Sequence, residues 1–304
     1  MYFAIEATHA SLPASICQEL SAICSTHIDR PMHLFALVDG AFDETLITDR
    51  NRKRLYRHSL YEKSTLEAFG AAAPHLFAAP IVAGEQLQWL EQMFAACAGK
   101  PMLSVIASAL SAEALQQHFR PYLIAQTPDG MEWPIRWGDT RVMPELLQAA
   151  DENHSTHLLS PLYCWWSVRR DGTLLSWQGA GASEPARPAF DNLPLNDLAF
   201  GRLVDAAEAD AVLANLYDSQ PDVLQRHSPA DCHARVAHHL AWASQHRIEA
   251  APDRQHFCML ALCLTKDFAR HPAMAALLQH TRQGLDYSSE VADLPPSFWQ
   301  DTAP

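Results

Sequence analysis

The spacing of apolar residues changes once along the chain, near residue 179. Before that point, short apolar runs such as 33–38 and 102–107 alternate with segments such as 85–98 and 112–119, which carry apolar residues every three or four positions. Short runs bounded by turn residues are typical of buried strands, and the longer spacing is typical of helices. The first region is therefore expected to be part of an α+β fold, with a mixed sheet flanked by helices.

The second region is expected to be all helical. Small residues and prolines interrupt every periodicity between residues 179 and 193, which indicates a linker. Helical spacing then recurs in four segments: 196–215, 229–246, 251–268 and 272–284. The predicted organisation is a mixed α/β domain over 1–178, a linker over 179–193, a helical domain over 194–285 and a loosely ordered tail over 286–304.

One segment, residues 133–142, combines aromatic and charged residues more densely than any other. Trp133, Ile135 and Trp137 occupy alternate positions in it, a period of two that would place a large apolar ridge on one face of a strand. The alternation ends at Gly138, and a helix is expected soon afterwards. This segment is predicted to form a strand-to-helix corner.

Charged residues are expected to hold this corner in place. The Asp139 carboxylate can accept backbone N–H bonds at the turn and can pair with Arg136 or with Arg141. A second acidic turn, Asp39-Gly40, closes the first buried run of the chain. We interpret these five residues as parts of a structural scaffold and predict no catalytic role for them.

Charge and cysteine content narrow the classes of function. The chain has 22 Lys and Arg against 35 Asp and Glu, a net charge of −13 that argues against a nucleic-acid binder. The seven Cys include no Cys-x-x-Cys pair, as expected of reduced thiols. No apolar stretch approaches the roughly 20 residues that span a bilayer, and no charged leader precedes an apolar core. A cytoplasmic protein without membrane contact is expected.

Two features are candidates for contact with a partner protein. The basic run 50–57 holds Arg50, Arg52, Lys53, Arg54, Tyr56 and Arg57, and its charge contrasts with the acidic whole. A solvated loop is the alternative interpretation of this run. Trp165 and Trp166 are adjacent, so on a strand they point to opposite faces. The second Trp of the pair either covers another apolar layer or anchors a partner.

Residues with catalytic or metal-binding potential occur, but their spacing does not fit a site. The histidine-rich segment 231–239 offers metal ligands, yet no pair in it has the helical spacing of four residues that places two ligands on one face; Cys258 and Cys263 lie five residues apart. Gly-x-Ser-x-Gly is absent, and Gly179-x-Gly181 lacks the third glycine of a phosphate-binding loop. We predict no catalytic residue, no metal and no cofactor.

Four separated motifs resemble the bacterial type VI secretion effector adaptor or chaperone family. They occur in the family's order and spacing at 34–41 (LFALVDGA), 59–61 (SLY), 73–76 (APHL) and 135–142 (IRWGDTRV). The resemblance covers about residues 32 to 168, and the helical remainder is similar in a looser way. In the last motif the family usually has Asp-Pro-Arg after an aromatic residue, where this chain has Asp139-Thr140-Arg141. The missing proline is expected to change the rigidity of the turn and not the fold.

The resemblance implies a function without catalysis. Members of this family bind a toxic effector and help to mount it on the spike protein of the secretion needle. The implied partners are thus a cognate effector and a spike protein. Two other functions stay open: an immunity protein that neutralises a toxin and, less favoured by the residues, a metal-dependent hydrolase centred on the histidine-rich helices.

Overall fold

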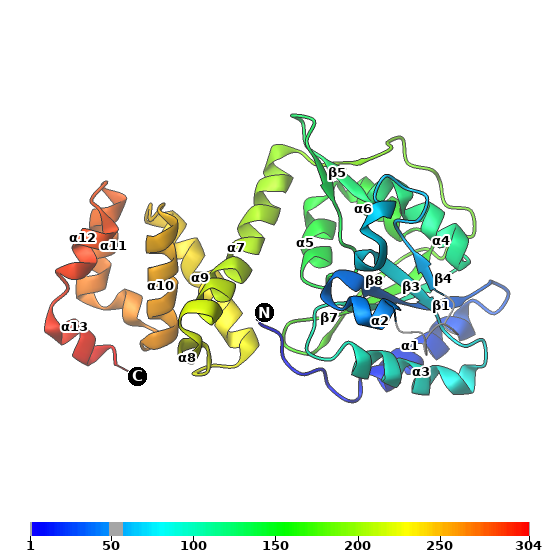
Figure 1. Ribbon diagram of the computed structural model, residues 1–304, viewed down its shortest axis with the longest axis horizontal. Helices are drawn as coiled ribbons and strands as arrows, with labels where there is room; N and C mark the ends of the chain where they lie inside the picture. Colours follow the sequence, from blue (N-terminus) through cyan, green and yellow to red (C-terminus); the bar gives the residue numbers. More distant parts are fainter. Residues whose placement is uncertain (1, 49–56, 304) are drawn as a thin grey trace. The chain divides into compact units, whose positions relative to one another are not determined.

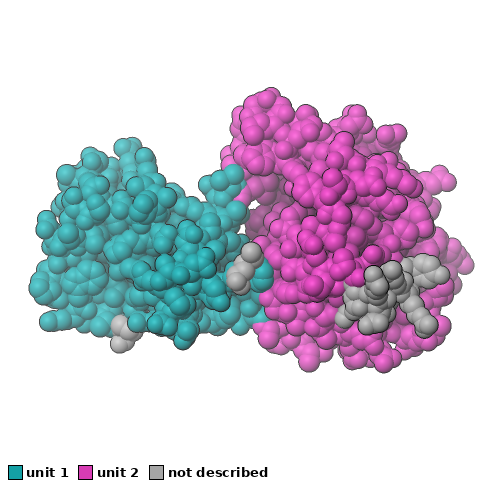
Figure 2. All heavy atoms as spheres, in the orientation of Figure 1, with its two compact units in different colours: residues 1–6, 204–304 teal, residues 7–203 magenta. Residues whose placement is uncertain are grey.

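The computed structural model describes residues 2–48 and 57–303, which form two compact units. Residues 7–203 make the larger unit, and residues 1–6 with 204–304 make the smaller one (Figure 2). The larger unit contains sheets flanked by helices, and the smaller unit is helical (Figure 1). The predicted α+β fold is therefore confirmed.

The main sheet of the larger unit has six strands in the order β2-β3-β1-β4-β7-β8, and every neighbouring pair is antiparallel. Their bounds are β1 His33–Asp39, β2 Arg57–Ser59, β3 Pro74–Ala78, β4 Leu103–Ser108, β7 Leu162–Val168 and β8 Leu174–Gln178. The central strands are almost entirely buried, which explains why their sequences are continuous apolar runs without alternation.

Two apolar clusters cover the two faces of this sheet. On one face, residues such as Ala36 and Val38 of β1 pack with α1 and α3. On the other face, Phe35 and Leu37 pack with α4, α5 and α6 (Figure 1). The helices are α1 Leu12–Thr26, α2 Glu44–Thr48, α3 Ala83–Ala96, α4 Ala112–Phe119, α5 Val142–Ala149 and α6 Glu152–Leu159; three 3₁₀ turns are η1 Gly40–Phe42, η3 Glu67–Ala72 and η4 Arg120–Tyr122.

A second sheet contains the beginning of the aromatic and charged segment 133–142. Its strands are β5 Ile124–Gln126, β6 Glu132–Pro134 and β9 Leu193–Pro194, with β6 antiparallel and β9 parallel to β5. Only 132–134 of the predicted alternating strand pairs with β5. Trp133 is consequently 40% exposed against the ring of Phe200, whereas Ile135 and Trp137 enter the core. The three apolar residues do not share one face.

The smaller unit consists of packed helices around two apolar clusters. Helix α7 Asp197–Ser219 enters this unit at Val204. The other elements are α8 Pro221–Leu224, α9 Pro229–Gln245, α10 Ala251–Cys263, η5 Phe268–Arg270, α11 Pro272–Arg282, α12 Tyr287–Ala292 and α13 Pro296–Asp301. Helix α10 ends earlier than the predicted segment, because Leu264 is extended and a turn follows.

The C-terminal residues are ordered, although their composition predicts a loose tail. They form α12 and α13, and the Phe298 side chain is fully buried in the same cluster as Phe257 and Phe268. Pro295 and Pro296 occupy the N-cap and the first helical turn of α13. Proline is compatible with these positions because its missing N–H has no helical acceptor there. The two prolines thus mark a helix start.

Candidate functional site

The end of strand β1 places a buried carboxylate beside a guanidinium from a distant part of the sequence. Asp39 is the last residue of β1, and its side chain is fully buried. Arg136 Nε donates a hydrogen bond to Asp39 Oδ2 at 3.0 Å. Burial raises the pKa of Asp39, and the nearby Arg136 charge lowers it in part. The pair joins the main sheet to the segment that follows the second sheet.

A second buried carboxylate, Asp139, completes the corner. Arg141 donates to it from Nε at 3.1 Å and from Nη2 at 2.9 Å, a bidentate arrangement. Arg136 Nη1 lies 4.0 Å from the same carboxylate. Of the two partners that the sequence leaves open, Arg141 is therefore the closer one and Arg136 links both acids. The Phe42 ring lies 4.5 Å from the Arg136 guanidinium and 5.4 Å from that of Arg141.

Glycines allow the chain to approach itself closely at this corner. A Cβ on Gly138 would lie 2.7 Å from the backbone nitrogen of Asp39, closer than real Cβ atoms come to backbone. A Cβ on Gly40 would collide with the carbonyl oxygen of Ala71. Neither glycine has a positive φ, so it is the missing side chain that matters here. The two glycines of the sequence motifs are explained by these contacts.

Hydrogen bonds connect all four sequence motifs around the corner. Gly40 of the first motif donates its N–H to the carbonyl of Ala73 in the third, at 3.0 Å. Leu60 of the second motif donates to Pro74 of the third at 2.9 Å. The Tyr61 hydroxyl, also in the second, donates to the Ile135 carbonyl of the fourth at 2.9 Å. With the pair between Asp39 and Arg136, the four motifs form one closed ring of contacts.

Of the six residues named in the predicted basic run, the structure describes only Arg57. Arg50, Arg52, Lys53, Arg54 and Tyr56 lie outside the described residues. Arg57 is described, begins strand β2 and is exposed.

The Trp165 and Trp166 side chains are both fully buried, so the prediction that one of them anchors a partner is wrong. They belong to the two apolar clusters on opposite faces of the main sheet. Trp165 Nε1 donates to the Ser104 hydroxyl at 2.8 Å, and Trp166 Nε1 donates to a Glu19 carboxylate oxygen at 2.6 Å. The second apolar layer was the correct interpretation of the doublet.

The histidine-rich helices direct their rings to separate partners. His239 Nδ1 lies 2.8 Å from the Arg235 carbonyl, and His246 Nδ1 lies 2.9 Å from the Leu278 carbonyl. His256 contacts the Tyr287 hydroxyl at 3.2 Å. Within 2–48 and 57–303, no three His, Cys, Asp or Glu side chains are grouped so that they could hold a metal ion.

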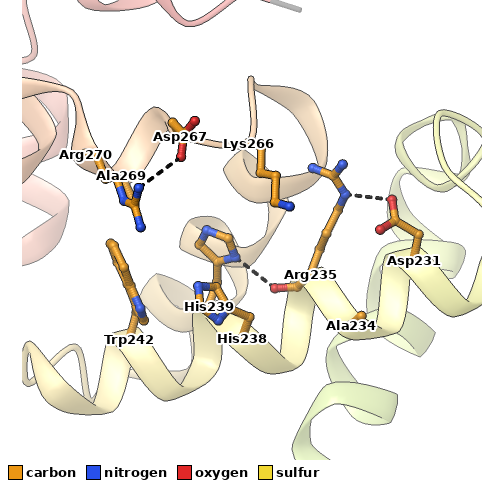
Figure 3. A pocket seen from close by; sticks show the side chains of 10 residues that line it. All are labelled: Asp231, Ala234, Arg235, His238, His239, Trp242, Lys266, Asp267, Ala269 and Arg270. Atoms are coloured by element: carbon orange, nitrogen blue, oxygen red, sulfur yellow. Dashed lines mark hydrogen bonds and ion pairs between the residues drawn. The ribbon is translucent and has the colours of Figure 1, made fainter.

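A cleft of about 410 Å³ in the smaller unit was not anticipated from the sequence (Figure 3). Helix α9 supplies Arg235, His238 and Trp242 to its wall, and the turn before α11 supplies Lys266 and Arg270. The α9 residues follow each other at three- and four-residue steps, which is the signal that places them on one helical face. No sequence signal connects that face to Lys266, because α10 intervenes.

One protein-family model matches the part of the chain that contains the corner. Residues 34–157 match the family model described as "Domain of unknown function (DUF4123)". The corner lies within these matched residues. This stretch runs from β1 into α6 and contains all four motifs, while the helical unit lies beyond it. No curated protein and no solved structure matches the chain.

None of the helices in the described part of the chain is long and apolar enough to cross a membrane.

Replacing Gly138 by alanine should destabilise the larger unit. The new Cβ meets the backbone of Asp39, so β1 or the corner must move, at a cost of about 1–3 kcal/mol in the free energy of unfolding. Gly84→Ala, in helix α3, is the matched control because a Cβ there meets open space. Chemical denaturation followed by circular dichroism measures both variants. Equal stability of the two would show that the close approach is not tight.

His75 should make stability depend on pH. It lies in the third motif and is 5% exposed, and burial, aided by the Arg57 charge, lowers its pKa to about 4. The unfolded chain takes up this proton near the usual value of about 6.5, so stability should fall as the pH drops from there toward 4, by on the order of 3 kcal/mol.

His75→Phe removes this titration and should flatten that part of the pH profile, measured by denaturation between pH about 7.5 and about 4.5. His33→Phe, at an exposed position of β1, is the control and should keep the wild-type slope. An unchanged slope in His75→Phe would mean that His75 is not the group responsible.

Proposed function

We propose that this protein is a type VI secretion adaptor or chaperone that binds a cognate effector and promotes its loading onto the spike protein, without catalysis of its own. The observation that carries the proposal is the convergence of the four motifs at one corner. Each motif is short, but together they resemble the adaptor family in order and spacing. The DUF4123 match covers the same part of the chain.

The corner suits the scaffold of such an adaptor better than its binding surface. Asp39 and Asp139 are 0% and 1% exposed, so a partner could not reach their carboxylates. Opposite charges are paired inside the corner, and the hydrogen bonds run to backbone groups of the same domain. A rigid frame of this kind leaves the faces around it free to vary with the effector.

An apolar groove of the same domain fits the binding of another protein. It has a volume of about 690 Å³ and lies where β1 begins and β3 ends, with Met32, Phe35 and Ile81 among its lining residues. The Ile81 side chain is fully exposed to solvent. Shielding an apolar segment of the effector before loading would cover this surface, and burial of apolar area would supply the binding energy.

Loading requires that the effector leave the adaptor when the spike is present. A handover without an energy source needs a difference in affinity, so that the effector binds the spike complex more tightly than the adaptor alone. We propose that binding energy alone drives this exchange.

Deletion of the gene for this protein should abolish delivery of one effector while the secretion apparatus still fires. The measurement is killing of susceptible neighbours by that effector, with release of the needle protein as the control for firing. The adaptor should also copurify with the effector. Unchanged delivery would contradict the proposal, and so would protection of cells that express the toxin domain alone, which is the behaviour of an immunity protein.

A further inference from the structure

The cleft of the smaller unit lies between helix α9 and the turn that carries Lys266. Figure 3 shows the side chains of Lys266 and Arg270 projecting from this turn toward the face of α9 that carries His239 and Trp242. Its volume of about 410 Å³ is large enough for one or two amino-acid side chains. The cleft lies outside the DUF4123 match, so the family model assigns nothing to it.

Two of the three cationic side chains that line this cleft form ion pairs, and the third, Lys266, forms none with the residues that the structure describes. Arg235 Nε donates to Asp231 at 2.7 Å, and Arg270 Nη1 lies 3.7 Å from Asp267. Each arginine therefore has an acid of its own. Lys266 is exposed and has no hydrogen-bond or ion-pair partner within the described residues. In a chain with a net charge of −13, this cleft is a local excess of positive charge.

Aromatic rings form the apolar part of the cleft. His239 is 6% exposed, and its ring stacks on that of Phe268 with 5.3 Å between the ring centroids. Burial lowers the pKa of His239, so its ring contributes an apolar surface to the cleft and no positive charge. Trp242 is half-buried, with its ring 5.6 Å from that of His238. The wall of the cleft thus combines aromatic rings, which are tilted against one another, with one ammonium group that has no partner among the described residues.

We propose that this cleft binds an acidic segment of a partner protein, with a carboxylate at Lys266 and a neighbouring apolar side chain against Trp242. A single free cation and aromatic rings in the wall of one cleft fit isolated carboxylates with apolar neighbours. Asp231 and Asp267 offset two of the three cations that line the cleft, and the one net positive charge that is left is too little for a polyphosphate backbone. The inference rests on the proposed function in one respect, that the segment comes from the effector.

A labelled peptide tests the cleft without the effector. The full-length protein is titrated with a fluorescein-labelled peptide of alternating glutamate and leucine, and binding is followed by fluorescence anisotropy. We expect saturable binding that weakens at least about tenfold when glutamine replaces glutamate in the peptide. The variant Lys266→Glu should weaken binding by at least a similar factor. Trp242→Ala should also weaken it.

Matched variants separate the cleft from general effects of charge and aromatic content. Lys63→Glu makes the same charge change at an exposed lysine of the larger unit, and Trp299→Ala removes a 40% exposed Trp of the smaller unit; both should bind like the wild type. Absence of binding, equal binding of the glutamine peptide, or unchanged binding by Lys266→Glu would overturn the proposal. Effector delivery that depends on the gene while no peptide binds would leave the adaptor function standing and remove the cleft from it.

Discussion

A carboxylate without access to water, Asp39 at the end of the central strand β1, is the constraint on which the larger unit depends. Burying a charge is costly unless a partner compensates it, and removal of one partner leaves the other uncompensated. Arg136 supplies the compensation, and it can do so only because the chain before it has turned back through the second sheet. The pair therefore fixes the position of one sheet relative to the other.

The glycines and the remaining motifs follow from the same constraint. Gly138 must lack a side chain because the corner touches the backbone of Asp39, and Gly40 must lack one because the chain next to it passes Ala71. Tyr61 closes the ring by its bond to the Ile135 carbonyl. Residues that are far apart in sequence thus stabilise the same corner of the larger unit.

The sequence predicted what depends on local pattern. The α+β class and the corner at 136–141 follow from periodicity and from charges within a few residues of each other. The pairing of Arg136 with Asp39 spans 97 residues and leaves no local signal. The burial of Trp166 depends on a second helical layer over the sheet. The helices at the C-terminus depend on the packing of Phe298 in an apolar cluster with residues of other helices. The cleft at Lys266 needs two elements that only the tertiary fold brings together.

A double-mutant cycle between Asp39 and Arg136 tests the central claim most directly. Asp39→Ala, Arg136→Ala and the double variant are unfolded by denaturant, and their free energies of unfolding are compared with that of the wild type. If the pair holds the corner, the double variant should lose less stability than the sum of the single variants, with a coupling of about 1–3 kcal/mol. Additive losses would contradict the account, because they would mean that the two side chains stabilise the domain independently.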